Sequence, residues 1–219
     1  MENKTINRRA FLRNSAGMAA GAMLLPMGTQ HVFGAATKIP AIPTVKLNNG
    51  LPMPLIGFGT NTLTGEVGNR SVADAISVGY RLIDTAHVYT NEEAVGEGIR
   101  KSGINRKELF ITSKLWVDFA GYESTKKAFQ NSIDKLGTDY LDLYLIHRPR
   151  GDVKGSWKAM EELYKAGKIK AIGVSNFEPV QLADLMKEAT VKPAINQIET
   201  HVFFQENNLN DVLVKKTIQ

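Results

Sequence analysis

The chain has 219 residues, which is enough for one domain with a sizeable hydrophobic core. Its 43% hydrophobic and 22% charged residues exclude the disordered, collagen-like and coiled-coil classes, and the absence of cysteine excludes a disulfide scaffold and a thiol nucleophile. Much of the net charge of +5 comes from residues 1–13, so no nucleic-acid partner is expected.

Residues 1–36 have the layout of an export signal. Arg8 and Arg9 precede Phe-Leu and a short, uncharged, apolar run over 15–25, and small residues follow at 34–36. This order is typical of a signal peptide, and the paired arginines resemble the twin-arginine type, which would make the export machinery a partner. The apolar run is shorter than the roughly 20 residues of a membrane span, so no stable membrane anchor is expected. We expect export to a bacterial periplasm; the alternative is a cytoplasmic protein with a helical N-terminal extension.

The domain over 37–219 begins with a predicted β-hairpin cap and continues as alternating strands and helices. Asn49-Gly50 predicts the hairpin turn within 44–54, because glycine supplies a positive φ angle. Short apolar runs predict buried strands at Leu55–Phe58, Arg81–Asp84, Leu109–Ser113, Leu141–Ile146, Ala171–Val174 and Ala194–Ile198. Helical periodicity covers Ser71–Val78, Glu92–Lys101, Ser124–Lys135, Lys154–Ala166 and Pro179–Lys187, and a further helix is expected within Asp211–Gln219.

This alternation predicts an α/β fold with a parallel sheet, either doubly wound or a TIM-like (β/α) barrel. A doubly wound nucleotide-binding fold usually carries a turn with three glycines after its first strand, and the turn that begins Gly57-Phe58-Gly59 lacks the third. Gly96 and Gly98 lie in a helical pattern, so we expect them to pack that helix closely on a strand. Neither a phosphate-binding loop of the P-loop type nor an HExxH zinc motif is present, and no metal site is expected.

Polar side chains mark the C-terminal ends of five of the predicted strands. They are Asp84, Lys114, His147, Ser175 with Asn176, and Gln197. In a barrel these strand ends converge on one mouth, where the active sites of such enzymes lie. A buried and unpaired charge costs several kcal/mol, so this pattern favours a shared site over packing and favours the barrel.

Five motifs surround these residues. They are Asp84-Thr85-Ala86-His87-Val88-Tyr89 with Asn91-Glu92-Glu93, Ser113-Lys114-Leu115-Trp116, Leu145-Ile146-His147-Arg148-Pro149, Gly173-Val174-Ser175-Asn176-Phe177 and Asn196-Gln197-Ile198-Glu199. In this order, over about 45–205, the sequence resembles the aldo-keto reductase family. The resemblance implies a TIM-like barrel that binds a nicotinamide cofactor, usually NADPH with NADH as the alternative, and reduces a small carbonyl substrate.

The family's four catalytic positions correspond to Asp84, Tyr89, Lys114 and His147. Tyr89 would donate the proton, and the ammonium of Lys114 would lower the pKa of this phenol from its usual value near 10. Asp84 would keep that ammonium charged, and His147 would polarise the carbonyl. The alternative for Asp84 and Lys114 is a purely structural ion pair.

Other positions are implied to contact the cofactor or the substrate. Ser175, Asn176 and Gln197 would hydrogen-bond the nicotinamide carboxamide, Thr60 and Asn61 would lie along the cofactor, and Trp116 would form a wall of the substrate pocket. The alternative for Trp116 is core packing, and His87 and His201 are expected to be structural. Arg148 and Val202-Phe203 depart from the family's frequent residues on the substrate side.

The resemblance extends over about six of the eight βα units of such a barrel. We therefore expect a domain that is truncated at its C-terminal end, and a monomer. Two alternatives to a reductase remain open, namely a non-catalytic cofactor-binding or regulatory protein on a reductase scaffold and an inactive truncated product.

Overall fold

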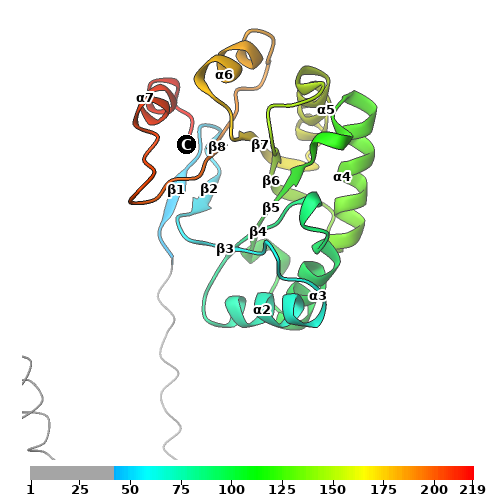
Figure 1. Cartoon of the computed structure of the whole chain (residues 1–219). Helices are drawn as coiled ribbons and strands as arrows, with labels where there is room; N and C mark the ends of the chain where they lie inside the picture. Colours follow the sequence, from blue (N-terminus) through cyan, green and yellow to red (C-terminus); the bar gives the residue numbers. More distant parts are fainter. Residues whose placement is uncertain (1–41) are drawn as a thin grey trace, which may run out of the picture. The chain divides into compact units, whose positions relative to one another are not determined.

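Six parallel strands form the centre of the structure, a computed structural model that describes residues 42–219. The predicted export signal lies outside the described residues. The strands pair in chain order, and each lies beside its predecessor along a curled arc (Figure 1). They are β3 (Gly57–Gly59), β4 (Leu82–Asp84), β5 (Phe110–Leu115), β6 (Leu141–Ile146), β7 (Ile169–Ser175) and β8 (Asn196–Gln197). This curled, parallel sheet fits the predicted TIM-like barrel class.

Helices follow the strands and lie outside the arc (Figure 1). They are α2 (Gly65–Ser77), α3 (Glu92–Ser102), α4 (Tyr122–Leu136), α5 (Val153–Lys165), α6 (Pro179–Met186) and α7 (Asn207–Lys216). Short 3-10 turns lie at η2 (His87–Tyr89), η3 (Arg106–Glu108) and η4 (Val117–Phe119). Within the described residues, none of these helices is long and apolar enough to cross a membrane.

The central strands β5 and β6 are buried throughout, and their successive side chains point to opposite faces of the sheet, so both faces are covered. On β6, Tyr144 and Ile146 join the large apolar cluster that also contains helix residues such as Phe129. Leu143 and Leu145 join a second cluster on the inner face. Parallel strands that are covered on both sides read as continuous apolar runs, which is why they were recognisable in the sequence.

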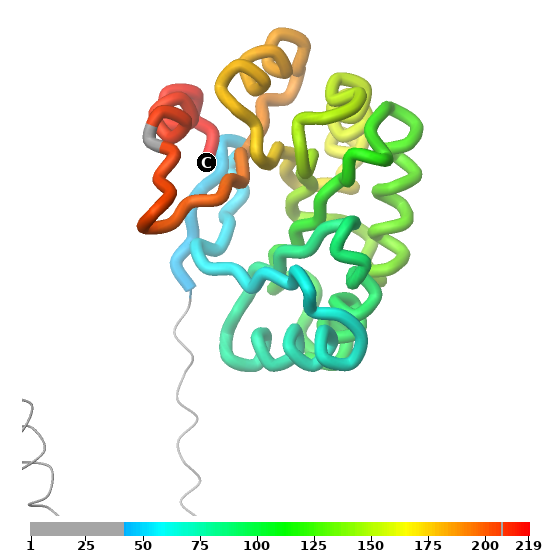
Figure 2. Tube along the Cα trace, viewed as in Figure 1, coloured from blue at the N-terminus to red at the C-terminus, as the bar shows by residue number. Residues whose placement is uncertain are grey.

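The predicted hairpin forms from β1 (Thr44–Lys46) and β2 (Pro52–Pro54), which pair antiparallel. Gly50 has a φ of 88°, in the left-handed region that the turn requires. Asn48 Nδ2 donates to Pro193 O at 2.8 Å, and Asn49 Nδ2 donates to Lys170 O at 2.9 Å. The chain ends close to the first of these contacts, since Gln219 N donates to Ala194 O at 3.2 Å (Figure 2).

Two boundary differences affect the site. The predicted strand over 109–113 continues through Lys114, and the one over 171–174 continues through Ser175. These two residues are therefore strand residues, and their positions are set by the pairing of the sheet. Helix α2 begins at Gly65 rather than Ser71, because its first turns are polar and carry little apolar periodicity.

The Gly96-Glu97-Gly98 segment packs α3 on neighbouring helices, not on a strand as predicted. A Cβ at Gly96 would lie 2.6 Å from Leu136 O, at the end of α4. A Cβ at Gly98 would lie 2.4 Å from Asn69 O, on α2. Both distances are shorter than real contacts allow, so only glycine permits these close approaches.

Candidate active site

The C-terminal ends of β4 and β5 bring together a buried ion pair. Lys114 Nζ donates to Asp84 Oδ1 at 2.9 Å, to Asp84 Oδ2 at 2.8 Å and to Thr85 O at 2.9 Å. All three ammonium hydrogens thus have acceptors. The Lys114 side chain is 1% exposed and that of Asp84 is 19% exposed. Burial lowers the pKa of Lys114, and the charge and hydrogen bonds of Asp84 oppose this shift.

Tyr89 lies beside this pair, at the end of η2. Its ring centroid is 5.2 Å from Lys114 Nζ and 5.9 Å from the centroid of the His147 ring. Burial, followed by the negative charge of Asp84, raises the pKa of Tyr89, and the positive charge of Arg148 opposes this shift. The direction is opposite to the lowering expected from the sequence, because burial of the phenol and the negative charge of Asp84 both disfavour the phenolate. At neutral pH the phenol is therefore protonated.

His147 directly follows β6 and is buried between two aromatic rings. The Tyr89 ring lies on one side, and the Trp116 ring centroid lies 5.2 Å away. Burial comes first among the causes that lower the pKa of His147 to about 4, followed by the positive charges of Lys114 and Arg148. The imidazole is therefore neutral at pH 7. Its Nδ1 is buried and has no hydrogen-bond partner within residues 42–219.

The amide and hydroxyl groups predicted to hold a cofactor lie at the ends of β7 and β8. Ser175 Oγ donates to Gln197 O at 3.0 Å, which joins the two strand ends. Asn176 has a φ of 60° and donates through Nδ2 to Ser175 Oγ at 2.8 Å and to His147 O at 3.2 Å. This set is therefore continuous with the His147 strand end.

Thr60 and Asn61 lie after β3, at the other edge of the sheet. Thr60 is fully buried, and both its N and its Oγ1 donate to Asp84 O, at 3.0 and 3.1 Å. Asn61 is exposed. The hydroxyl of Thr60 thus fixes the strand that carries Asp84, and Asn61 is the freer of the two side chains.

The family model described as "Aldo/keto reductase family" matches residues 55–219. This chain belongs to the aldo/keto reductase family. It is 51% identical to glyoxal reductase of Bacillus subtilis over 178 residues, which cover 80% of this chain and 64% of that protein. The chain thus spans less than two thirds of the length of that relative.

Solved structures of the family have the same fold. An aldo/keto reductase from Brucella melitensis superposes with a TM-score of 0.80 at 46% identity, covering 81% of this chain and 71% of that one. A Bombyx mori aldo-keto reductase solved in complex with NADP superposes with a TM-score of 0.76 at 35% identity, covering 82% of this chain and 65% of that one.

Residues that sequence reasoning did not assign also support the site of this aldo/keto reductase. Asn91 Nδ2 donates to Thr60 O at 2.6 Å and to Leu63 O at 2.9 Å, and its Oδ1 accepts from Thr85 Oγ1 at 2.9 Å. The loop after β3 and the start of α3 are thereby tied to the residue that binds Lys114. The buried Glu92 and Ser113 are likewise joined, at 2.6 Å. The Asn91-Glu92 pair lies in one of the motifs, but the sequence could not show which groups it contacts.

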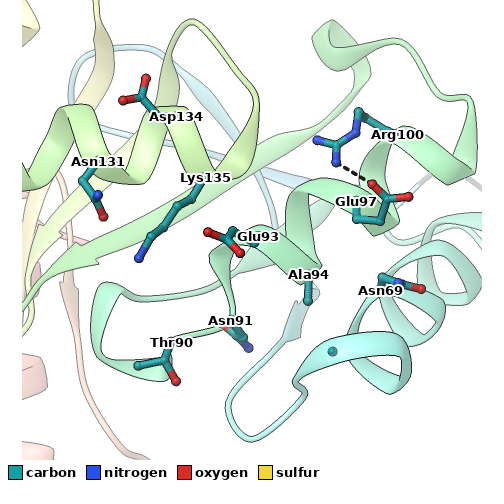
Figure 3. Close-up of a pocket in the computed structure, with 11 residues that line it drawn as sticks. Asn69, Thr90, Asn91, Glu93, Ala94, Glu97, Arg100, Asn131, Asp134 and Lys135 are labelled. Atoms are coloured by element: carbon teal, nitrogen blue, oxygen red, sulfur yellow. Dashed lines mark hydrogen bonds and ion pairs between the residues drawn. The ribbon is translucent and has the colours of Figure 1, made fainter.

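A groove on the outer surface of the family fold is separate from this chemistry (Figure 3). It has a volume of about 780 Å³ between α2, α3 and α4, and the ion pair between Arg100 and Glu97 lies in it. None of the four residues at the catalytic positions lines it. No cluster of three or more metal-ligating side chains was found among residues 42–219.

Proposed function

We propose that this protein reduces an aldehyde or ketone to an alcohol with a nicotinamide cofactor. The observation that carries the proposal is the buried Lys114–Asp84 pair, which lies beside both the Tyr89 ring and the neutral His147. Each of these groups suits one part of carbonyl reduction; Asp84, Lys114 and His147 come from adjacent strand ends, and Tyr89 lies on the η2 turn that follows β4.

The residues present fit a nicotinamide carboxamide, which offers both hydrogen-bond donors and an acceptor. Ser175 and Asn176 provide a hydroxyl and an amide at one edge of the mouth. Within the described residues, the side-chain amide of Gln197 makes no hydrogen bond and remains available. When bound, the nicotinamide would supply the hydride that no side chain can provide. We propose NADPH as the cofactor, with NADH as the alternative, and the family member solved with NADP supports a cofactor of this class.

Tyr89 is the proposed proton donor to the carbonyl oxygen. Its raised pKa keeps the phenol protonated at neutral pH, which a general acid requires. The nearby ammonium of Lys114 stabilises the negative charge that forms on the phenol oxygen as the proton leaves. Asp84 holds this ammonium in place, since a buried cation without a partner would lose its proton.

His147 is the proposed second contact to the carbonyl oxygen. Because its pKa is about 4, the ring is neutral at pH 7 and offers an N–H donor rather than a competing acid. Trp116 packs against this ring and is partly exposed, so it is placed to wall the substrate pocket.

Two further proposals concern the rest of the chain. We propose that residues 1–36 direct export by the twin-arginine route and that the protein works as a monomer. We also propose that the β1–β2 hairpin caps the N-terminal end of the barrel. The burial of Leu47 in the inner-face cluster and the hydrogen bond from Asn49 to Lys170 O, at the start of β7, support this second role.

The experiment that tests the function combines binding and turnover. NADPH fluorescence would report binding, and its oxidation by 4-nitrobenzaldehyde would report reduction. We expect both for the native protein. Tyr89→Phe should keep binding and lose about 10²–10⁴-fold in turnover, because it removes a general acid. Tyr164→Phe, which removes a hydroxyl remote from the site, is the matched control. Binding without turnover in the native protein would contradict the proposal.

A further inference from the structure

A buried carboxylate near the site has no role in the proposed chemistry. Glu92, the first residue of α3, is 2% exposed. Its Oε1 accepts a hydrogen bond from Ser113 Oγ at 2.6 Å. Its Oε2 is buried and has no hydrogen-bond partner within the described residues. Burial of a carboxylate is costly unless its oxygens are paired, so the position of this one requires an explanation.

The unpaired oxygen of Glu92 faces the ring of His87. Glu92 Oε2 and His87 Nδ1 are 3.8 Å apart, and Nδ1 is also buried without a partner in the described part of the chain. This distance is longer than a hydrogen bond, and a movement of about 1 Å would form one. Tyr144 OH, from β6, is a further buried group without a partner here, and the negative charge of Glu92 contributes to the raised pKa of Tyr144.

Glu92 lies between the strand that carries Lys114 and the turn that carries Tyr89. Ser113 directly precedes Lys114 on β5, and successive strand residues point to opposite faces, so Ser113 meets α3 while Lys114 meets the mouth. His87 is the first residue of η2, and Tyr89 is its last. Glu92 therefore links the strand of the ammonium to the turn of the phenol.

The η2 turn has few restraints of its own. It has no side-chain capping hydrogen bond, and none of its residues is buried. Its backbone is closed by the bond from Tyr89 N to Ala86 O at 3.0 Å, and Thr90, which follows, has a φ of 53°. The His87 ring packs on the Phe119 ring of η4, with centroids 4.6 Å apart. A carboxylate anchored on β5 is thus placed to limit the movement of the turn.

We infer that Glu92 is a positioning residue, which holds Tyr89 beside Lys114 by accepting a hydrogen bond from Ser113 of β5 and by facing His87 of η2 at 3.8 Å. The inference rests on the role of Tyr89 in the proposed function. A misplacement of about 1 Å can lower a rate by about 10²-fold. The proposed carboxamide-binding residues lie at the C-terminal ends of β7 and β8, so their contacts with the cofactor should not depend on Glu92.

Three variants test this role. Glu92→Leu removes both the hydrogen bond to Ser113 and the polar group that faces His87, whereas Glu92→Gln keeps the shape and can still accept from Ser113. Glu161→Leu is the matched control, because Glu161 is also a buried carboxylate; it accepts from Thr190 N and Val191 N at 2.6 and 2.7 Å, away from η2. With NADPH and 4-nitrobenzaldehyde, we expect Glu92→Leu to lower kcat on the order of 10²-fold with unchanged NADPH Kd. Glu92→Gln should restore most of the rate, and Glu161→Leu should keep it.

A second measurement does not depend on turnover. The ¹³Cζ signal of Tyr89, assigned by its loss in Tyr89→Phe, reports the titration of this phenol. We expect Glu92→Leu to shift the titration and Glu161→Leu to leave it unchanged. If Glu92→Leu does not fold, Ser113→Ala and His87→Phe each remove one link and should give smaller shifts.

The outcomes separate the inference from the function on which it rests. Native kcat and native Tyr89 titration in a folded Glu92→Leu protein, or in both single-link variants, would overturn the inference. Equal losses in Glu92→Leu and Glu161→Leu would also overturn it, because they would show general destabilisation. A native protein that reduces no carbonyl would overturn the proposed function instead, and the Tyr89 titration would still decide the role of Glu92.

Discussion

Lys114 donates to both carboxylate oxygens of Asp84 while its own side chain is almost completely buried. An ion pair of this kind is strongly destabilising when only one partner is removed, because the other charge remains buried and uncompensated. The same pair holds the proposed stabilising charge beside Tyr89. Stability and activity should therefore respond differently to single and double substitutions at these two residues.

We expect Asp84→Leu to lower the free energy of unfolding by about 3 kcal/mol, because it leaves the ammonium of Lys114 without a counter-charge. Lys114→Met combined with Asp84→Leu should cost less than the sum of the two single changes. Urea unfolding of the four proteins measures this coupling. Carbonyl reduction should be lost in all three variants. The double variant should therefore recover part of the stability that the single changes remove, but none of the activity. Additive effects on stability would contradict the pairing.

A pH dependence follows from His147. Its pKa falls from the ordinary 6.5 to about 4 on folding. Above pH 6.5 the ring is neutral in both states, and between pH 6.5 and 4 the unfolded chain binds a proton that the folded chain does not. Stability should therefore fall as the pH is lowered through this window, by up to about 3 kcal/mol.

The matched variant for this pH dependence is His147→Gln, which cannot titrate. Urea unfolding at pH 7 and pH 4.5 should show a larger loss for the native protein than for the variant. An equal loss of stability in both proteins would show that the acid sensitivity comes from carboxylates elsewhere in the chain and not from His147.

The packing of α3 gives a prediction about stability alone. A Cβ at Gly98 would lie 2.4 Å from Asn69 O and 2.7 Å from Val72 Cβ. We expect Gly98→Ala to destabilise the protein by about 1–3 kcal/mol, despite the better helix propensity of alanine. Gly59→Ala is the control, because a Cβ there would meet nothing within 4 Å. Thermal unfolding compares the two, and a native transition in Gly98→Ala would contradict the close approach of α2 and α3.

The export proposal predicts a location. Replacing Arg8 and Arg9 together by lysine keeps the charge but removes the paired arginines, so we expect the protein to stay in the cytoplasm. Arg13→Lys should leave export unchanged, since it lies outside the pair. Fractionation of cells that express each variant, with the cofactor-binding assay on each fraction, checks the result. Export of the doubly substituted protein would show that the twin-arginine route is not used.

Much of the candidate site could be predicted from the sequence because its residues follow recognisable strands. Asp84, Lys114 and His147 each stand at the end of a continuous apolar run, and parallel pairing must then bring them to one edge. Tyr89 was added by the motif around the end of the strand that carries Asp84. The structure places these side chains together, and their chemical roles stay predictions.

Three features could not be predicted, since each depends on residues far apart in the chain. The pKa of Tyr89 is raised rather than lowered, because its burial and the charge of Asp84 depend on the folded environment. The helix glycines pack against α2 and α4, which local periodicity cannot identify. The contact between Glu92 and Ser113 exists only because α3 lies across β5.

The sequence by itself thus determined the α/β class, the order of elements and the group of polar strand ends, because apolar periodicity and turn residues are local signals. Only the tertiary structure decided which charges pair, which pKa values rise or fall, and which buried groups lie behind the site. Those properties arise from burial and from electrostatic fields summed over several elements, and no single stretch of the chain contains them.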